Sequence, residues 1–143
     1  MASDAWLSLL VSTLFDAPVD WGPELLVSAL NGRLIENPSG STRHRRGYLV
    51  EGIDAPAGVR GESAAGQDGW RAIHFTIEPS LGVSLKQVAA IVRRACDEFD
   101  VLPPQVDAVE YRWKVAGGRF WVRERRAGEA LVGLGLTAEG AKP

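Results

Sequence analysis

The segment Ala108–Arg126 reads AVEYRWKVAGGRFWVRERR, and it decides the fold class. Apolar and polar residues alternate on both sides of Ala116-Gly117-Gly118, and this period of two is typical of a half-buried β-strand. Glycines in a short connection supply the positive φ angles that a tight hairpin needs. The segment therefore predicts two antiparallel strands, Ala108–Val115 and Arg119–Arg126, joined by a hairpin turn.

The same alternation assigns the two faces of this hairpin. One face is apolar and carries Val109, Tyr111, Trp113, Val115, Phe120 and Val122. The opposite face places a tryptophan among cations and carries Arg112, Lys114, Arg119, Trp121, Arg123 and Arg125. Because an antiparallel sheet commonly packs one face on the core and leaves the other in water, we expect the basic face at the surface.

Apolar periodicity predicts helices and strands before this hairpin. Residues 1–32 are expected to form a helical hairpin that ends at Gly32, a favoured residue just beyond a helix C-terminus. Tyr48–Ile53 and Trp70–Glu78 have the composition and alternation of strands. The order of helices and strands therefore favours a sheet with helices on one face.

A capping box begins the best predicted helix. Ser84 and Gln87 have the required S-x-x-Q spacing, and the apolar stripe that follows predicts a helix over residues 85–99. Ala130–Leu136 is predicted to be a last edge strand or a short helix. Glycine, proline and polar residues predict loops at 36–47 and 54–69, the latter long and flexible, and a disordered tail at 137–143.

The predicted fold class is α+β. We expect a mostly antiparallel sheet of about four to six strands. The N-terminal helical hairpin and one central amphipathic helix are expected to pack on one face of it. Residues 1–143 are expected to form a single domain, because no smaller piece of this chain would bury a core.

Composition excludes several classes of protein. The 143 residues are 45% hydrophobic and 24% charged, which is typical of globular domains and not of disordered chains. A pI near 5.7 excludes a uniformly basic nucleic-acid binder. The single cysteine, Cys96, closes no internal disulfide, and with His44 and His74 it supplies too few ligands for structural zinc. No cofactor is predicted.

The apolar run Ala5–Phe15 has some of the character of a targeting or membrane segment. A secretory signal would have a lysine or arginine before such a run, and this run is preceded by none. The run is also too short to cross a bilayer. We therefore expect a cytoplasmic protein that has no membrane partner.

Neither a catalytic nor a metal site is predicted. His74 has Glu78 on its own strand face, but that residue would lie about 13 Å along the strand, too far to orient the imidazole. The acidic cluster Asp97, Glu98 and Asp100 falls at the end of the predicted helix, where ion pairs with preceding arginines explain two of its members. The expectation is a protein that is not an enzyme. A small enzyme whose pocket uses His74 or His44 as a base is the opposing hypothesis.

Charge is segregated along the chain, although the net charge is only −2. Residues 1–32 hold four acids and no base, whereas residues 109–126 hold six basic residues against two acids. A second basic stretch lies in the 36–47 loop and contains Arg43, His44, Arg45 and Arg46. This stretch is a possible accessory to the basic hairpin face.

Arginine beside an exposed tryptophan is the composition of interface hot spots. We therefore predict a non-catalytic protein-binding module of the immunity, chaperone or assembly type. Its basic sheet face would bind a protein partner with an acidic surface. A second hypothesis is single-stranded nucleic-acid binding through the same face. A third is an oligomeric assembly subunit in which Ala130–Leu136 pairs with a neighbouring chain. The oligomeric state itself is not predicted.

Overall fold

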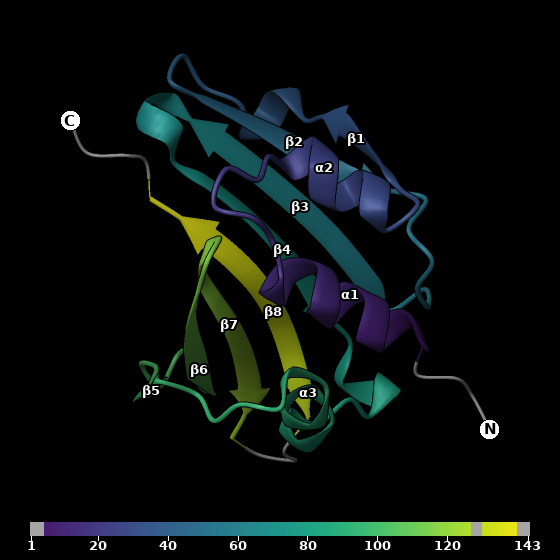
Figure 1. Ribbon diagram of the computed structural model, residues 1–143, viewed down its shortest axis with the longest axis vertical. Coiled ribbons are helices and arrows are strands. Elements are labelled where there is room, and N and C mark those ends of the chain that lie inside the picture. Colours follow the sequence, from purple (N-terminus) through teal and green to yellow (C-terminus); the bar gives the residue numbers. More distant parts are fainter. Residues whose placement is uncertain (1–4, 127–129, 140–143) are drawn as a thin grey trace.

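A computed structural model describes residues 5–126 and 130–139 of the chain. It has α+β architecture, with an open antiparallel sheet of eight strands in the order β1-β2-β3-β4-β8-β7-β6-β5. The strands are β1 (Arg33–Glu36), β2 (Arg45–Glu51), β3 (Val59–Gly66), β4 (Arg71–Ile77), β5 (Glu98–Val101), β6 (Ala108–Val115), β7 (Gly118–Arg125) and β8 (Leu131–Ala138). The α-helices of the described residues are α1 (Ala5–Phe15), α2 (Pro23–Ala29) and α3 (Leu85–Val92). Figure 1 shows α1 and α2 crossing one face of this sheet.

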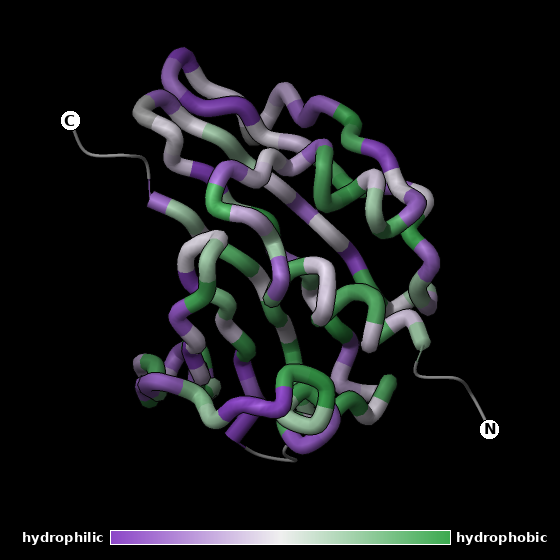
Figure 2. Tube along the Cα trace, in the orientation of Figure 1, coloured by the Kyte–Doolittle hydropathy of each residue, from purple (hydrophilic) through white to green (hydrophobic). Residues whose placement is uncertain are grey.

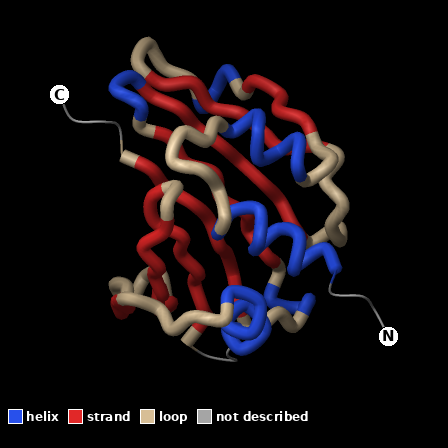
Figure 3. The backbone as a smooth tube through the Cα atoms, in the orientation of Figure 1, coloured by secondary structure: helices blue, strands red, loops and turns tan. Residues whose placement is uncertain are grey.

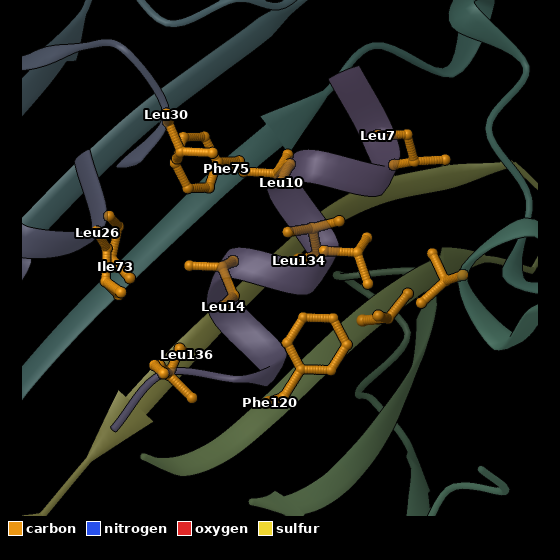
Figure 4. Close-up of a cluster of buried hydrophobic side chains, with 14 of the residues drawn as sticks. Leu7, Leu10, Leu14, Leu26, Leu30, Ile73, Phe75, Phe120, Leu134 and Leu136 are labelled. Atoms are coloured by element: carbon orange, nitrogen blue, oxygen red, sulfur yellow. The ribbon is translucent and has the colours of Figure 1, made fainter. Parts of the chain in front are cut away.

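The core lies between the helices and the central strands. Leu7, Leu10 and Leu14 form one stripe of α1 at helical spacing, and all three are buried. They pack toward buried residues of the sheet such as Phe75 of β4 and Phe120 of β7, as Figure 4 shows. This burial of apolar surface supplies the main stabilisation of the fold.

Strand register confirms the two predicted faces of the β6–β7 hairpin. Trp113 is paired with Phe120, both side chains are buried, and Phe120 is in turn paired with Leu136 of β8. The basic residues of the same strands therefore lie on the face opposite the helices, which we call the open face. The alternation of hydrophobic and hydrophilic residues along the strands can be followed in Figure 2.

The prediction of about four to six strands was too low. β2 begins at Arg45, inside the predicted 36–47 loop, and β3 occupies half of the predicted flexible loop at 54–69. Gly61 of β3 is explained by packing, because a Cβ there would lie 2.6 Å from the ring of Phe75. β3 is held by pairing with both β2 and β4, which a local pattern does not reveal.

β8 corrects the prediction of an edge strand or short helix at Ala130–Leu136. It is a central strand, paired with β4 on one side and β7 on the other. It also extends to Ala138, so the predicted disordered tail at 137–143 is wrong for its first two residues. Residues 140–143 of that tail lie outside the described residues.

The predicted helix at 85–99 is shorter in the structure. Its capping box is present, but α3 ends at Val92, and Arg93 adopts a left-handed conformation with φ 56°. The chain then attaches to β6: the Trp113 indole donates a hydrogen bond to the Arg94 carbonyl at 3.0 Å. The helix therefore ends where the chain begins to contact the sheet, and β5 follows.

The helices also pack differently from the prediction. Val88 is the buried residue of α3, so the expected packing of one long amphipathic helix is not confirmed. α1 makes more contacts with α3 than with α2, while α2 packs on β1, β3 and β4. The first two helices are therefore neighbours on the sheet (Figure 3) without forming a closely packed hairpin.

Candidate functional site

The open face gathers the predicted basic residues by cross-strand pairing. Lys114 of β6 is paired with Arg119 of β7, and Arg112 is paired with Trp121. Arg123 is paired with Glu110 in the same hairpin. Because directly opposed residues point to the same side of an antiparallel sheet, these side chains share one surface.

A hollow of about 380 Å³ lies at the centre of this surface. Four of the six predicted binding residues line it: Arg112, Arg119, Trp121 and Arg123. The other two lie outside it. Lys114 borders an adjacent depression that it shares with Arg119, and Arg125 is exposed at the end of β7. The hollow also contains His74 and Thr137, which the sequence analysis did not assign to the site.

Trp121 lies across β8 at the floor of the hollow. A Cβ added to Gly135 would sit 2.5 Å from the indole ring, so only glycine leaves room for it. The indole N–H donates a hydrogen bond to the Thr137 hydroxyl at 3.3 Å, and the Arg123 guanidinium stands over the ring at 4.9 Å. The indole is thus held on several sides. The alternation of glycine and leucine in β8 was the sequence signal for this arrangement.

Glu110 is the buried charge of the site, with only 8% of its surface exposed. Its carboxylate accepts hydrogen bonds from Arg112 at 2.6 Å and from Arg123 at 2.9 Å. Burial raises the pKa of this carboxyl, but the hydrogen bonds and charges of the two arginines outweigh burial, and the pKa lies below its ordinary value. Glu110 therefore stays ionised at neutral pH and fixes both guanidinium groups.

Edge strand β5 adds two acids, Glu98 and Asp100, to the open face. Both were predicted to lie at the end of a helix. Arg112 lies 3.8 Å from carboxylate oxygens of both Glu98 and Asp100, and Arg119 lies 3.7 Å from Glu98. The ion pairs expected at helical i,i+4 spacing are replaced by others: Asp97 pairs with Arg94 at 3.2 Å, three residues before it. The open face is consequently a mosaic of both charges and not a uniformly basic surface.

His74 has a carboxylate partner that the sequence analysis missed. Glu62 of β3 is its cross-strand neighbour, with 3.4 Å between His74 Nε2 and Glu62 Oε2. The His74 ring also lies 6.4 Å from the Trp121 ring, at the border of the hollow. The partner was missed because β3 was predicted to be a loop. Both side chains remain accessible to solvent, at 42% and 57%.

The predicted accessory loop is divided by the structure. Arg45 and Arg46 belong to β2, and Arg46 pairs with Glu36 at 2.7 Å. The Arg45 guanidinium stands over the Trp70 ring at 5.1 Å, and Arg45 lines a small hollow together with Glu62 and His74. Arg45 therefore joins the open face, whereas Arg43 and His44 are exposed in the turn before β2.

Comparisons of the chain with protein-family models, with curated proteins and with solved structures find no match. Within the described residues, no helix has the length and apolar character needed to cross a membrane. Residues 5–126 and 130–139 also hold no cluster of three or more His, Cys, Asp or Glu side chains suited to a metal ion.

Proposed function

We propose that the open face is the binding surface of a non-catalytic module, which holds an acidic surface of a protein partner. The observation that carries this proposal is the arrangement of Arg112, Arg119 and Arg123 around Trp121 in one shallow hollow. Guanidinium groups pair with carboxylates through two parallel hydrogen bonds, and arginine and tryptophan are enriched at the centres of protein interfaces.

Preorganisation supports this role. Glu110 holds Arg112 and Arg123 in place, and Gly135 and Thr137 hold Trp121. Side chains that are ordered before binding lose less conformational entropy when a partner arrives. The face is therefore built to bind with little rearrangement.

Exposed cations are available beside this fixed centre. The Arg119 and Arg123 side chains are 53% and 42% exposed, and Lys114 is exposed next to them. Arg119 is held by a longer contact, 3.7 Å, with Glu98. Lys114 and Arg119 can exchange water for partner carboxylates without breaking a buried pair, so they are expected to supply the affinity for acidic residues.

The charge mosaic disfavours a nucleic acid as the partner. Glu62, Glu98 and Asp100 lie on the same face and would repel phosphates that pass over the hollow. The Trp121 ring is also covered by Arg123 and by the β8 backbone at Gly135, which leaves less of it for base stacking. A folded protein can place its carboxylates opposite the arginines and no acid opposite Glu62, Glu98 and Asp100, so an acidic patch on a protein surface fits this face better.

The geometry also bears on assembly and on catalysis. An assembly contact through Ala130–Leu136 would need a free strand edge, and β8 has none because it is paired on both sides.

The His74–Glu62 pair has the geometry of an oriented imidazole. The thiol of Cys96 is not beside it as a nucleophile, because Cys96 packs on the helix side of the sheet. Binding is therefore the function that the site supports best.

The test compares two charge reversals on opposite faces. The double variant Lys114→Glu/Arg119→Glu alters the open face, and Lys86→Glu on α3 is the control for charge reversal elsewhere, since Lys86 is exposed on the helix side. Partners are captured from native extract with the full chain and identified, and the purified pair is then titrated. The double variant should weaken binding about tenfold or more, while the control binds like the original chain.

Two results would refute this proposal. One is equal affinity of the original chain and the double variant for the purified partner. The other is tight binding of a single-stranded oligonucleotide that falls steeply between low and moderate salt and is lost in the double variant. The second result would assign the same face to nucleic acid.

A further inference from the structure

Among the described residues the sheet ends at β5, and no other strand pairs with its outer edge. β5 is bonded to β6 on one side, with Glu98 opposite Arg112 and Val101 opposite Val109. The Leu102 N–H donates to the Ala108 carbonyl at 3.0 Å, so Leu102 directs its backbone groups toward β6. In an antiparallel strand, the N–H and C=O groups of successive residues point alternately to one neighbour and to the other. The alternation directs the N–H and C=O groups of Phe99 and Val101 away from β6. Figure 1 shows β5 and β1 at opposite ends of the sheet.

Apolar side chains accompany this free edge on the helix side. Phe99 is 66% exposed and Val101 is 56% exposed, and Val106 in the next turn is 46% exposed. Phe99 leans on Tyr111 at 6.1 Å between ring centroids, at the margin of the core. α3 ends at Val92 and does not cover these side chains. An exposed apolar row beside unpaired backbone groups is the usual template for an added strand.

The other edge strand is protected differently. β1 carries Arg33 and Glu36, which alternate to opposite faces and pair with β2 residues at 3.2 Å and 2.7 Å. Charges on both faces of an edge strand discourage strand addition. β5 instead carries its charges, Glu98 and Asp100, on the open face alone, with side chains 42% and 60% exposed.

These acids also decide which strand can be added. If a second copy continued the sheet by antiparallel β5–β5 pairing, residues of the same face would lie opposite one another. Glu98 and Asp100 would then face the same acids of the other copy, and like charges in directly opposed positions are destabilising. A strand with cations on the open face and apolar residues on the helix face would meet opposite charges and apolar side chains.

We propose that β5 accepts an extended segment of a partner protein, in which lysine or arginine alternates with apolar residues, as a ninth strand of the sheet. This inference goes beyond the proposed function: it uses the edge of the sheet and not its open face, and it selects a basic segment and not an acidic one. Main-chain hydrogen bonds to Phe99 and Val101 would supply affinity, and the alternation would supply specificity.

The probe is a synthetic eight-residue peptide of alternating lysine and valine. A peptide of alternating glutamate and valine, and one with the lysines and valines in separate blocks, serve as controls. Binding is titrated with the full chain, and amide exchange is followed by NMR. The alternating lysine peptide should bind at least about tenfold more tightly than either control, as opposite charge pairs replace like ones. It should also slow exchange at the Phe99 and Val101 amides.

Val101→Pro provides the decisive variant. Proline is tolerated on an edge strand where the N–H faces solvent, so this chain should fold while losing one outward donor. Glu36→Pro places the same change on β1, where the alternation also directs the N–H outward, because the Asn37 N–H bonds the Gly47 carbonyl at 2.8 Å. Peptide affinity should fall about tenfold in Val101→Pro and stay unchanged in Glu36→Pro. Amide spectra confirm that both variants are folded.

A second variant keeps the test independent of proline. Glu98→Lys/Asp100→Lys should reverse the preference, so that the glutamate peptide binds and the lysine peptide does not. The inference is overturned if the lysine peptide does not bind, if the glutamate peptide binds equally well, if protection appears in β1, or if the chain itself dimerises through β5. The Lys114→Glu/Arg119→Glu variant should retain peptide binding, which separates failure of this inference from failure of the proposed function.

Discussion

Glu110→Gln tests whether the buried carboxylate organises the open face. The substitution preserves size and removes the charge. The glutamine carbonyl can accept from one of Arg112 and Arg123, and its NH₂ group then faces the other guanidinium, donor against donor. The expected result is a loss of stability together with loosened arginines.

The magnitude follows from the two hydrogen bonds. A hydrogen bond to a charged group contributes about 1.5–3 kcal/mol. The arginine side chains keep 23% and 42% of their surface in water, which favours the lower end of that range. With one of the two bonds lost and the other weakened, the free energy of unfolding should fall by about 2 kcal/mol at pH 7.

The pH dependence gives this prediction a second readout. The pKa of Glu110 is lower in the folded chain than its ordinary value of 4.5. Its stabilising contribution is therefore complete above that value and is lost as the pH falls through the lower, folded-state pKa. The difference between the original chain and Glu110→Gln should be constant near neutrality and should shrink in acid.

Urea unfolding of both chains from pH 7 down to pH 3 is the assay. Glu62→Gln is the control, because Glu62 lies on the same face with a side chain that is 57% exposed, and it should change stability by less than about 0.5 kcal/mol. The reasoning is refuted if Glu110→Gln is as stable as the original chain at pH 7. It is also refuted if the difference between them stays constant through the acid range.

Three further predictions concern packing in the core and at the site. Phe75→Ala should cost about 3–5 kcal/mol in chemical unfolding, because Phe75 is fully buried, and a loss below about 1 kcal/mol would contradict its place in the core. Gly135→Ala should cost about 1–3 kcal/mol and shift the indole N–H resonance of Trp121, whereas an unchanged resonance would mean that the ring does not lie on β8. Trp21→Phe should cost about 1–2 kcal/mol in thermal unfolding, since the buried hydrogen bond from its indole to the Gly117 carbonyl, 2.7 Å long, is removed; full stability would argue against that bond.

The β6–β7 hairpin was predictable because its information is local. A period of two assigns every side chain of Ala108–Val115 to one face or the other without knowledge of its neighbours. The capping box at Ser84 and Gln87 was predictable for the same reason, since both of its hydrogen bonds close within one turn.

β3 and β5 were not predictable from local pattern. β3 reads VRGESAAG, and its Gly61 is favoured because a Cβ there would meet the ring of Phe75 on the neighbouring strand. The apolar stripe of α3 continues into the segment that becomes β5, so periodicity extended the helix to residue 99. Attachment of residues 94–97 to β6 overrides that periodicity: the Lys114 N–H bonds the Asp97 carboxylate at 2.6 Å.

The sequence by itself determined that Arg112, Arg119, Trp121 and Arg123 share the face opposite the apolar residues, because that placement depends only on alternation along each strand. Only the tertiary structure decided which side chains of other strands lie beside these four. Glu98, Asp100, His74 and Glu62 come from strands whose pairing depends on contacts distant in sequence. Which strands become neighbours depends on the apolar surface that the whole sheet buries and on the cost of closing the loops between them. For this reason a face predicted to be basic carries both charges.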